Sequence, residues 1–145
     1  MTDTRPVIAV IGGTGSQGSG LAMRWAKAGY PVVIGSRDRN RAEQSAIEIA
    51  ATAPRNNNWG SVRGTDNLSA AAECEIAVLA VPHANQLNTL KPISNALKGK
   101  ILIDVTAPLK PPKVSTVQLP EAGSAVIESQ KMLGENVTVV AAFQN

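Results

Sequence analysis

The sequence predicts an α/β fold built on a doubly wound parallel sheet of about six strands. Two observations support this prediction. Short apolar runs alternate along the chain with segments of helical character, which is the order of parallel strands joined by crossover helices. In addition, residues 75–81 form a nearly continuous apolar run, typical of a strand buried on both faces. With 145 residues, 43% of them hydrophobic, the chain has the size and apolar content of one domain.

The expected elements alternate along the whole chain. In residues 1–74 they are strand 6–12, helix 16–28, strand 31–35, helix 38–52, strand 61–64 and helix 67–74. Gly29 and Pro54 stop the two long helices. In residues 75–145 they are strand 75–81, helix 84–97, strand 100–105, helix 121–132 and strand 137–142. Residues 106–117 contain three prolines, so we expect an extended loop there.

A glycine-rich segment follows the first expected strand and opens the first expected helix. It reads Gly-Gly-Thr-Gly-Ser-Gln-Gly over residues 12–18 and matches the G-x-G-x-x-G fingerprint of dinucleotide binding. We expect Gly13 to let the chain turn off the strand, Gly15 to let the backbone approach a pyrophosphate, and Gly18 to let the helix pack on the sheet. The sequence therefore predicts a Rossmann-type fold with a bound dinucleotide, and the alternative is a glycine-rich turn without a ligand.

The end of the second expected strand indicates which dinucleotide binds. An NAD site carries Asp or Glu there to accept a hydrogen bond from the ribose 2′-OH, whereas this chain has Ser36 and Arg37. A hydroxyl and a guanidinium bind a 2′-phosphate, which a carboxylate would repel. We therefore expect NADP(H) in preference to NAD(H). Asp38 also lies near the position of the acid, but it suits the N-cap of the next helix. Arg39 is interpreted as a solvated charge.

Composition excludes several classes of function. The net charge is +3, no basic run is present, and only 3% of residues are aromatic, which argues against a nucleic-acid surface. No apolar stretch is long enough to cross a bilayer and residues 1–6 lack the features of a signal peptide, so we expect a cytoplasmic protein without a membrane partner. The single cysteine, Cys74, is expected to be a packed residue, and no metal site is expected.

Few side chains at the expected strand ends are capable of acid–base or covalent chemistry. They are Ser36, His83, Asp104 and Thr106. His83 follows the fourth expected strand, where a nicotinamide would lie, and it could shuttle a proton or cap the next helix. Asp104 is expected to anchor a loop. The sequence identifies no definite catalytic residue, and His83 is the one candidate. Hydride transfer between two redox cofactors needs chiefly that their rings be positioned, which suits such a site.

Several segments together resemble NADPH-dependent coenzyme F420 reductases. They are residues 11–22, 33–37, 76–82 and 139–145. The resemblance implies an oxidoreductase that transfers a hydride reversibly between NADP(H) and C5 of the deazaflavin coenzyme F420. It also implies three groups of cofactor-binding residues. These are Thr14, Gly15, Ser16 and Gln17 at the pyrophosphate, Ser36, Arg37 and Arg41 at the 2′-phosphate, and Val81, Pro82 and His83 beside the nicotinamide.

The resemblance sets further expectations about the protein and its partners. The family has a small C-terminal helical domain that helps to enclose the deazaflavin and to dimerise. Because the chain stops directly after the sixth expected strand, we expect residues 1–145 to be an NADP(H)-binding Rossmann domain without that helical domain, either naturally minimal or truncated. The expected partners are small-molecule redox cofactors, and a homodimer stays open.

Two other functions also stay open. In one, the chain is an NADPH-dependent reductase of another acceptor, such as ferric iron, an imine or a carbonyl. In the other, it is a noncatalytic NADP(H)-binding sensor. His83-Ala84 follow Pro82 where some members of the resembled family carry a bulkier aromatic and acidic pair.

Overall fold

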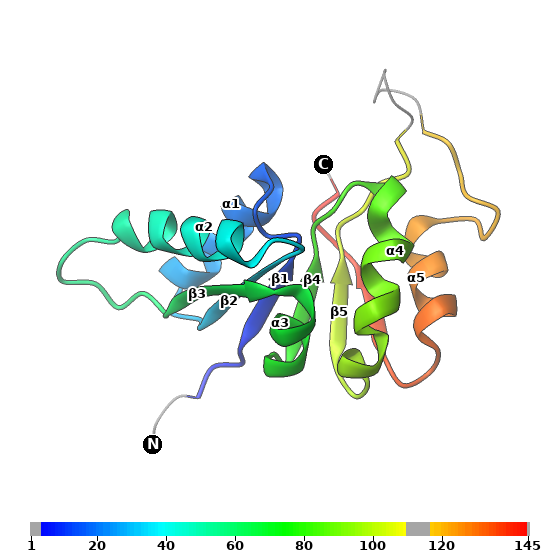
Figure 1. Ribbon diagram of the computed structural model, residues 1–145. Coiled ribbons are helices and arrows are strands. Elements are labelled where there is room, and N and C mark those ends of the chain that lie inside the picture. Colours follow the sequence, from blue (N-terminus) through cyan, green and yellow to red (C-terminus); the bar gives the residue numbers. More distant parts are fainter. Residues whose placement is uncertain (1–3, 110–116, 145) are drawn as a thin grey trace.

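A computed structural model describes residues 4–109 and 117–144 of the chain. It shows a six-stranded parallel sheet with the strand order β3-β2-β1-β4-β5-β6 (Figure 1). The strands are β1 (Ile8–Ile11), β2 (Val32–Ser36), β3 (Val62–Asp66), β4 (Ile76–Leu79), β5 (Ile101–Asp104) and β6 (Thr138–Ala141). The winding direction reverses between β1 and β4, which confirms the predicted doubly wound, Rossmann-type sheet.

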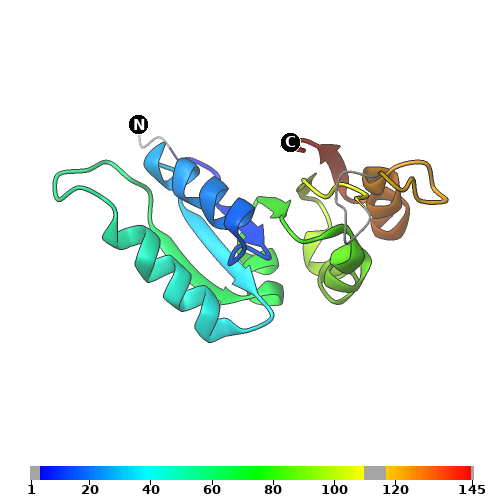
Figure 2. The same cartoon turned by 90° about the horizontal axis from the view of Figure 1, so that it is seen from above.

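Helices cover both faces of this sheet. They are α1 (Ser16–Lys27), α2 (Arg39–Ala51), α3 (Asn67–Glu73), α4 (Gln86–Leu90) and α5 (Ala125–Leu133), with 3₁₀ segments η1 (His83–Asn85) and η2 (Lys91–Leu97). Viewed from above, α1 and α2 lie toward one end of the molecule and α4 and α5 toward the other (Figure 2). Within the two described ranges, no helix is long and apolar enough to span a membrane.

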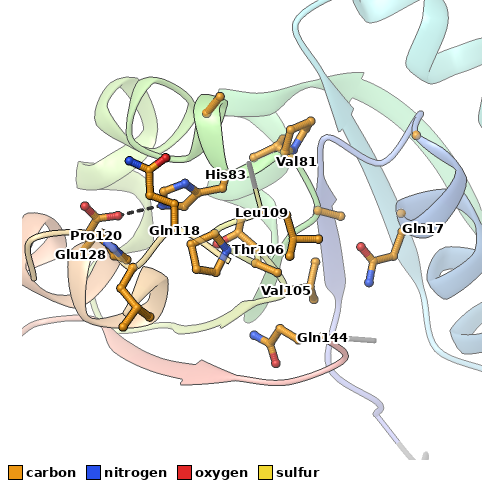
Figure 3. Close-up of a pocket in the computed structure, with 18 of the residues that line it drawn as sticks. Gln17, Val81, His83, Val105, Thr106, Leu109, Gln118, Pro120, Glu128 and Gln144 are labelled. Atoms are coloured by element: carbon orange, nitrogen blue, oxygen red, sulfur yellow. Dashed lines mark hydrogen bonds and ion pairs between the residues drawn. The ribbon is translucent and has the colours of Figure 1, made fainter. Parts of the chain in front are cut away.

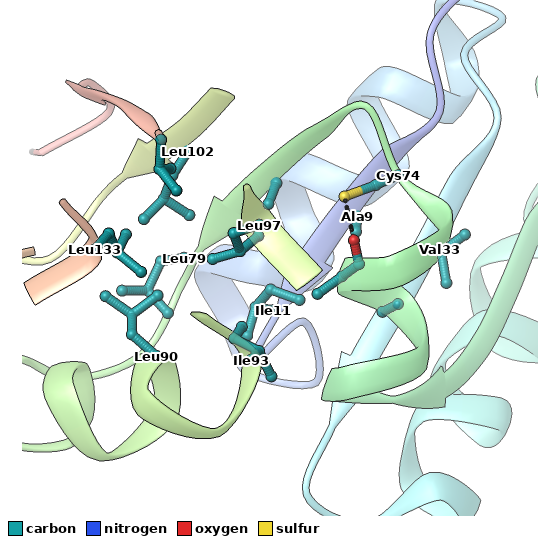
Figure 4. Packing of buried hydrophobic residues seen from close by; sticks show 14 residues of the cluster. Ala9, Ile11, Val33, Cys74, Leu79, Leu90, Ile93, Leu97, Leu102 and Leu133 are labelled. Carbon is teal, nitrogen blue, oxygen red and sulfur yellow. Dashed lines mark hydrogen bonds between the residues drawn. The ribbon is translucent and has the colours of Figure 1, made fainter. Parts of the chain in front are cut away.

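The larger apolar cluster packs β1, β4 and β5 against α3, α4, η2 and α5 (Figure 4). Ile11, Leu79 and Leu102 lie fully buried in it. Cys74 belongs to the same cluster, and its Sγ donates a hydrogen bond to the Ala71 carbonyl oxygen at 3.4 Å. Burial raises the pKa of the Cys74 thiol. The prediction that Cys74 is a packed residue is therefore confirmed.

The opposite face is packed by small residues. Ala22 and Ala26 of α1 and Ala42 and Ala46 of α2 are buried against the β1 and β2 side chains. Because alanine adds only a methyl group, both helices approach the sheet closely. The short loop between β1 and α1 places the N-terminus of α1 at the carboxyl edge of β1, where the ligand of such a sheet binds.

Two predicted helices differ from the observed ones. The helix expected over 84–97 is divided into η1, α4 and η2. α4 ends before η2 because Pro92 cannot donate the backbone hydrogen bond that would continue it. The last helix begins at Ala125 rather than Glu121, since Gly123 has a positive φ of 100° and Ser124 caps the helix. The extended loop expected over 106–117 lies partly outside the described residues, and its ends join through a bridge between Leu109 and Val117.

Candidate functional site

A cleft of about 820 Å³ opens at the carboxyl ends of β1, β4 and β5 (Figure 3). This is the edge where the strand order reverses, and the volume lies within the range of small-molecule sites. The lining comprises residues 15–18, 80–84, 105–109, 118–121, 128 and 144. The cleft thus brings together the glycine-rich loop and the segment from Val81 to His83, which the sequence assigned to one cofactor.

The turn at the end of β1 depends on Gly12 rather than on Gly13. Gly12 has a φ of +74°, and a Cβ placed there would lie 2.4 Å from Cγ1 of Val81 and 2.9 Å from the Ala80 carbonyl oxygen. Gly13 does not have a positive φ, but a Cβ there would lie 2.8 Å from the Val10 carbonyl oxygen. The prediction that Gly13 makes the turn is therefore wrong. Gly13 instead allows close packing.

The other two glycines of the motif differ sharply in their surroundings. A Cβ at Gly18 would lie 2.9 Å from the Cα of Gly13, so a glycine is required for α1 to pack on the loop, whereas the sequence placed this contact on the sheet. A Cβ at Gly15 would find its nearest neighbour, the Gly12 carbonyl oxygen, at 3.8 Å. The fold therefore leaves room at Gly15, and a ligand can approach the backbone in that space.

The N-terminus of α1 also lacks a side-chain cap. Its N-cap residue, Gly15, offers no side-chain hydrogen bond, whereas Asp38, Asp66 and Ser124 cap α2, α3 and α5. Asp38 accepts hydrogen bonds from the backbone N–H groups of the first turn of α2 at 3.0 and 3.4 Å, which confirms its predicted capping role. The uncapped N–H groups of α1 remain available to an anion, which the helix dipole also favours.

Three of the predicted phosphate ligands lie at the end of β2 and in the first turn of α2. The backbone of β2 adjoins the glycine-rich loop, because the Gly13 N–H donates to the Gly35 carbonyl oxygen at 3.0 Å. The Ser36 hydroxyl accepts a hydrogen bond from the backbone N–H of Asp38 at 3.1 Å. Arg37 and Arg41 are exposed and form no ion pair with any residue in the described ranges. These residues do not line the cleft and lie beyond its glycine-rich end.

Arg39 is placed differently from these two arginines. Its Nε lies 3.0 Å from Oε1 of Glu43, one helical turn further along α2, and its side chain is 63% exposed. This arrangement is the solvated surface charge that the sequence indicated. Arg39 therefore serves as a natural comparison for Arg37.

The far side of the cleft carries an ion pair. Nε2 of His83, the first residue of η1, lies 3.0 Å from Oε2 of Glu128 in α5 (Figure 3). The two side chains are only 26% and 22% exposed. This contact ties α5 to the end of β4. Among the described lining residues, the titratable side chains are these two and Glu121.

A buried polar network supports this side of the cleft. Asp104 at the end of β5 is fully buried, and its Oδ2 accepts hydrogen bonds from Gln86 at 2.8 Å and from Ser129 at 2.6 Å. Its Oδ1 accepts a hydrogen bond from the backbone N–H of Thr106 at 2.9 Å. Gln86 also donates to the Ala125 carbonyl oxygen at 2.7 Å. Asp104 therefore anchors the loop after β5, as the sequence predicted, and joins it to α4 and α5.

Comparison with known proteins decides the family. Residues 7–108 match the model of the family described as NADP oxidoreductase, coenzyme F420-dependent. The chain belongs to this family. The resemblance identified in the sequence is thereby confirmed, and the cleft described above is the candidate site of an F420-dependent NADP oxidoreductase family member.

Two curated relatives in the family are similar along most of the chain. The F420-dependent NADP reductase of Methanothermobacter thermautotrophicus is 43% identical over 143 residues, and that of Methanothermobacter marburgensis is 40% identical over 142 residues. Each alignment covers 95% of this chain but only 60% or 62% of the relative. The chain thus spans about three fifths of the length of the curated relatives it matches.

A solved structure is similar as well. It is that of a proposed F420-dependent NADP reductase from Arthrobacter sp. FB24, with a TM-score of 0.74 and 26% identity. The match covers 94% of this chain and 62% of that chain.

Several residues that follow β5 and line the cleft were not predicted from the sequence. They are Pro108, Leu109, residues 118–121, Glu128 and Gln144. Glu128 lies within an amphipathic helix without any local motif, and Gln144 reaches the site through a hydrogen bond to the Asp104 carbonyl oxygen at 2.7 Å. These residues reach the cleft only because α5 and β6 pack beside β5. A correct prediction of the strand order would therefore have identified them.

Proposed function

We propose that this chain binds NADP(H) in the cleft and takes part in hydride transfer between NADP(H) and coenzyme F420. The observation that carries the nucleotide half is the space at Gly15 beside the uncapped N-terminus of α1. The choice of F420 is supported by membership of the family and by the names of the curated relatives. When bound, the nucleotide supplies a hydride at C4 of its nicotinamide, and the deazaflavin accepts one at C5.

The glycine-rich end of the cleft suits the diphosphate of NADP(H). In this proposal, the backbone of residues 14–17 binds the pyrophosphate, because the N–H groups at the start of α1 have no side-chain cap. Gly15 lets the phosphates approach closely. Ser36, Arg37 and Arg41 bind the 2′-phosphate, since the two guanidinium groups have no ion-pair partner among the described residues.

The rest of the cleft suits two flat rings. Its walls carry several apolar side chains, namely Val81, Pro82, Val105, Pro108, Leu109, Leu119 and Pro120. Such walls exclude water and hold rings by contact, which is what hydride transfer between two cofactors requires. Val81, Pro82 and His83 flank the nicotinamide in this proposal. His83 is held by Glu128 and is the one candidate for handling a proton.

The proposal extends to the protein as a whole. We infer that residues 1–145 form the NADP(H)-binding domain of a cytoplasmic oxidoreductase whose partners are small-molecule redox cofactors. Assembly as a homodimer stays a prediction.

An acceptor panel tests the function. Purified protein is mixed with NADPH that carries deuterium at C4, and oxidation is followed with F420, a free flavin, a ferric chelate, an imine or no acceptor. We expect F420 to be the one acceptor in the panel that supports NADPH oxidation, with deuterium recovered at C5 of the reduced deazaflavin. Faster oxidation with another acceptor would overturn the choice of F420. Tight NADPH binding without oxidation in any arm would instead support a noncatalytic sensor.

A further inference from the structure

Thr106, directly after β5 and Val105, carries a buried hydroxyl. The residue is 4% exposed and lines the cleft (Figure 3). Its Oγ1 finds no hydrogen-bond partner among the residues that the structure describes. Buried hydroxyl groups are nearly always hydrogen-bonded. A buried hydroxyl without a partner has lost its hydrogen bonds to water and gained none in return, which costs free energy. A buried hydroxyl at the wall of a cleft therefore indicates a ligand.

The backbone of Thr106 is held in place by the network below it. Its N–H donates to Oδ1 of Asp104 at 2.9 Å, and Oδ2 of Asp104 is bound by Gln86 and Ser129. The residue therefore cannot move as a whole to find a partner within the protein. Only rotation about its Cα–Cβ bond is left, and that rotation moves the hydroxyl between staggered positions.

Thr106 also adjoins the wall assigned to the nicotinamide. β4 and β5 are parallel neighbours, and the Val105 N–H donates to the Leu79 carbonyl oxygen at 3.2 Å. Thr106 therefore follows β5 beside the segment that follows β4, which contains Val81 and Pro82. Those two side chains are apolar, so they offer a ring no side-chain hydrogen bond. His83, the third residue of this wall, is engaged with Glu128, so a partner for a polar substituent of the ring can come from the neighbouring strand.

We propose that the Thr106 hydroxyl turns toward the cleft and forms a hydrogen bond with the nicotinamide carboxamide of NADP(H). This inference rests on the proposed function. A hydroxyl both donates and accepts, and a primary carboxamide offers an acceptor oxygen and two N–H donors, so the two groups are complementary. The bond orients the ring about its glycosidic link. Asp104, Gln86 and Ser129 act as positioning residues for Thr106.

Thr106→Val provides a test because valine keeps the side-chain shape and removes only the hydroxyl. Two nucleotides are titrated by calorimetry: NADPH, and 2′-phospho-ADP-ribose, which keeps the pyrophosphate and the 2′-phosphate but lacks nicotinamide. We expect Thr106→Val to weaken NADPH binding roughly tenfold and to leave binding of 2′-phospho-ADP-ribose unchanged. Thr106→Ser, which keeps the hydroxyl, should restore most of the NADPH affinity.

The melting temperature without ligand provides an independent reading. Removing an unpartnered buried hydroxyl should leave the melting temperature of Thr106→Val unchanged or raise it. Ser129→Ala, which removes a paired hydroxyl from the same network, should lower it.

Several outcomes would overturn the inference. It is wrong if Thr106→Val binds NADPH as tightly as the original chain does, or if both nucleotides lose affinity equally. It also fails, together with the proposed function, if the original chain binds neither nucleotide. Nucleotide binding with the expected selective loss, but no F420 reduction, would sustain the inference and contradict only the proposed hydride transfer.

Discussion

The two ends of the cleft are built in different ways. The nucleotide end consists of residues 15–18, which line the cleft, and of the end of β2, which lies just beyond it at the carboxyl edge of the neighbouring strand. The other end is assembled by contacts between distant parts of the chain. His83 meets Glu128 across 45 residues, and Gln86 meets Ala125 across 39. A site formed by one motif can be read in a sequence, whereas a site formed by several elements depends on the fold.

Two substitutions in the glycine-rich loop should affect the nucleotide end differently, one through folding stability and the other through NADPH binding. Gly12→Ala should lower the free energy of unfolding by about 2–4 kcal/mol, because its Cβ would lie 2.4 Å from Val81 at a φ of +74°. Gly15→Ala has room for its Cβ and should change unfolding little. It should nevertheless weaken NADPH binding by about 1–3 kcal/mol, because the methyl group would meet the pyrophosphate. Urea unfolding and NADPH titration measure the two effects. Equal destabilisation by both substitutions would mean that Gly15 serves only the fold.

The distant end should respond to loss of its buried network. Gln86→Ala should lower the free energy of unfolding by about 2–3 kcal/mol, because the buried Asp104 carboxylate would lose a donor. Gln44→Ala, which removes an exposed contact to Glu48, is the matched control and should have little effect. Urea unfolding measures both. If Gln86→Ala also changed the preference for NADPH over NADH, the two ends would not be independent.

His83 tests whether the distant end of the cleft supplies a proton or only positions the rings. If ring positioning dominates, His83→Ala should slow F420 reduction by much less than the hundredfold or more that loss of an essential general acid causes. A single-turnover measurement with saturating NADPH separates this step from binding. Collapse of hydride transfer with NADPH binding intact would instead favour an imine or carbonyl acceptor, which needs a proton donor.

Asp66 offers a smaller, pH-dependent test near the nucleotide end. The Ser69 N–H and hydroxyl donate to its carboxylate and lower the pKa of Asp66 below 3.8. The stabilisation that ionised Asp66 contributes is therefore fully present above its ordinary pKa and is lost as pH falls through the lowered pKa. When pH is lowered from neutral to below about 4, the free energy of unfolding measured with urea should fall less in Asp66→Asn than in the original chain. An unchanged pH dependence would show that this cap contributes nothing measurable.

The strand and helix pattern predicted the sheet, the glycine-rich loop and the capping role of Asp38, because each depends on neighbouring residues. It assigned the turn to Gly13 because the motif alone does not show which glycine contacts Val81 and adopts a positive φ. It extended one helix through Pro92, where the missing N–H ends α4. Glu128 escaped prediction because its role comes from a tertiary contact to His83.

The central claim is that the end of β2 recognises the 2′-phosphate and that α1 receives the pyrophosphate. Calorimetric titration of NADPH and NADH into the original chain, Arg37→Ala and Arg39→Ala tests it most directly. We predict that Arg37→Ala loses about 1.5–3 kcal/mol of NADPH binding free energy and little for NADH, because only NADPH carries the phosphate. Arg39→Ala, whose arginine is already paired with Glu43, should match the original chain. Equal losses for both nucleotides in Arg37→Ala, or no preference for NADPH in the original chain, would contradict the claim.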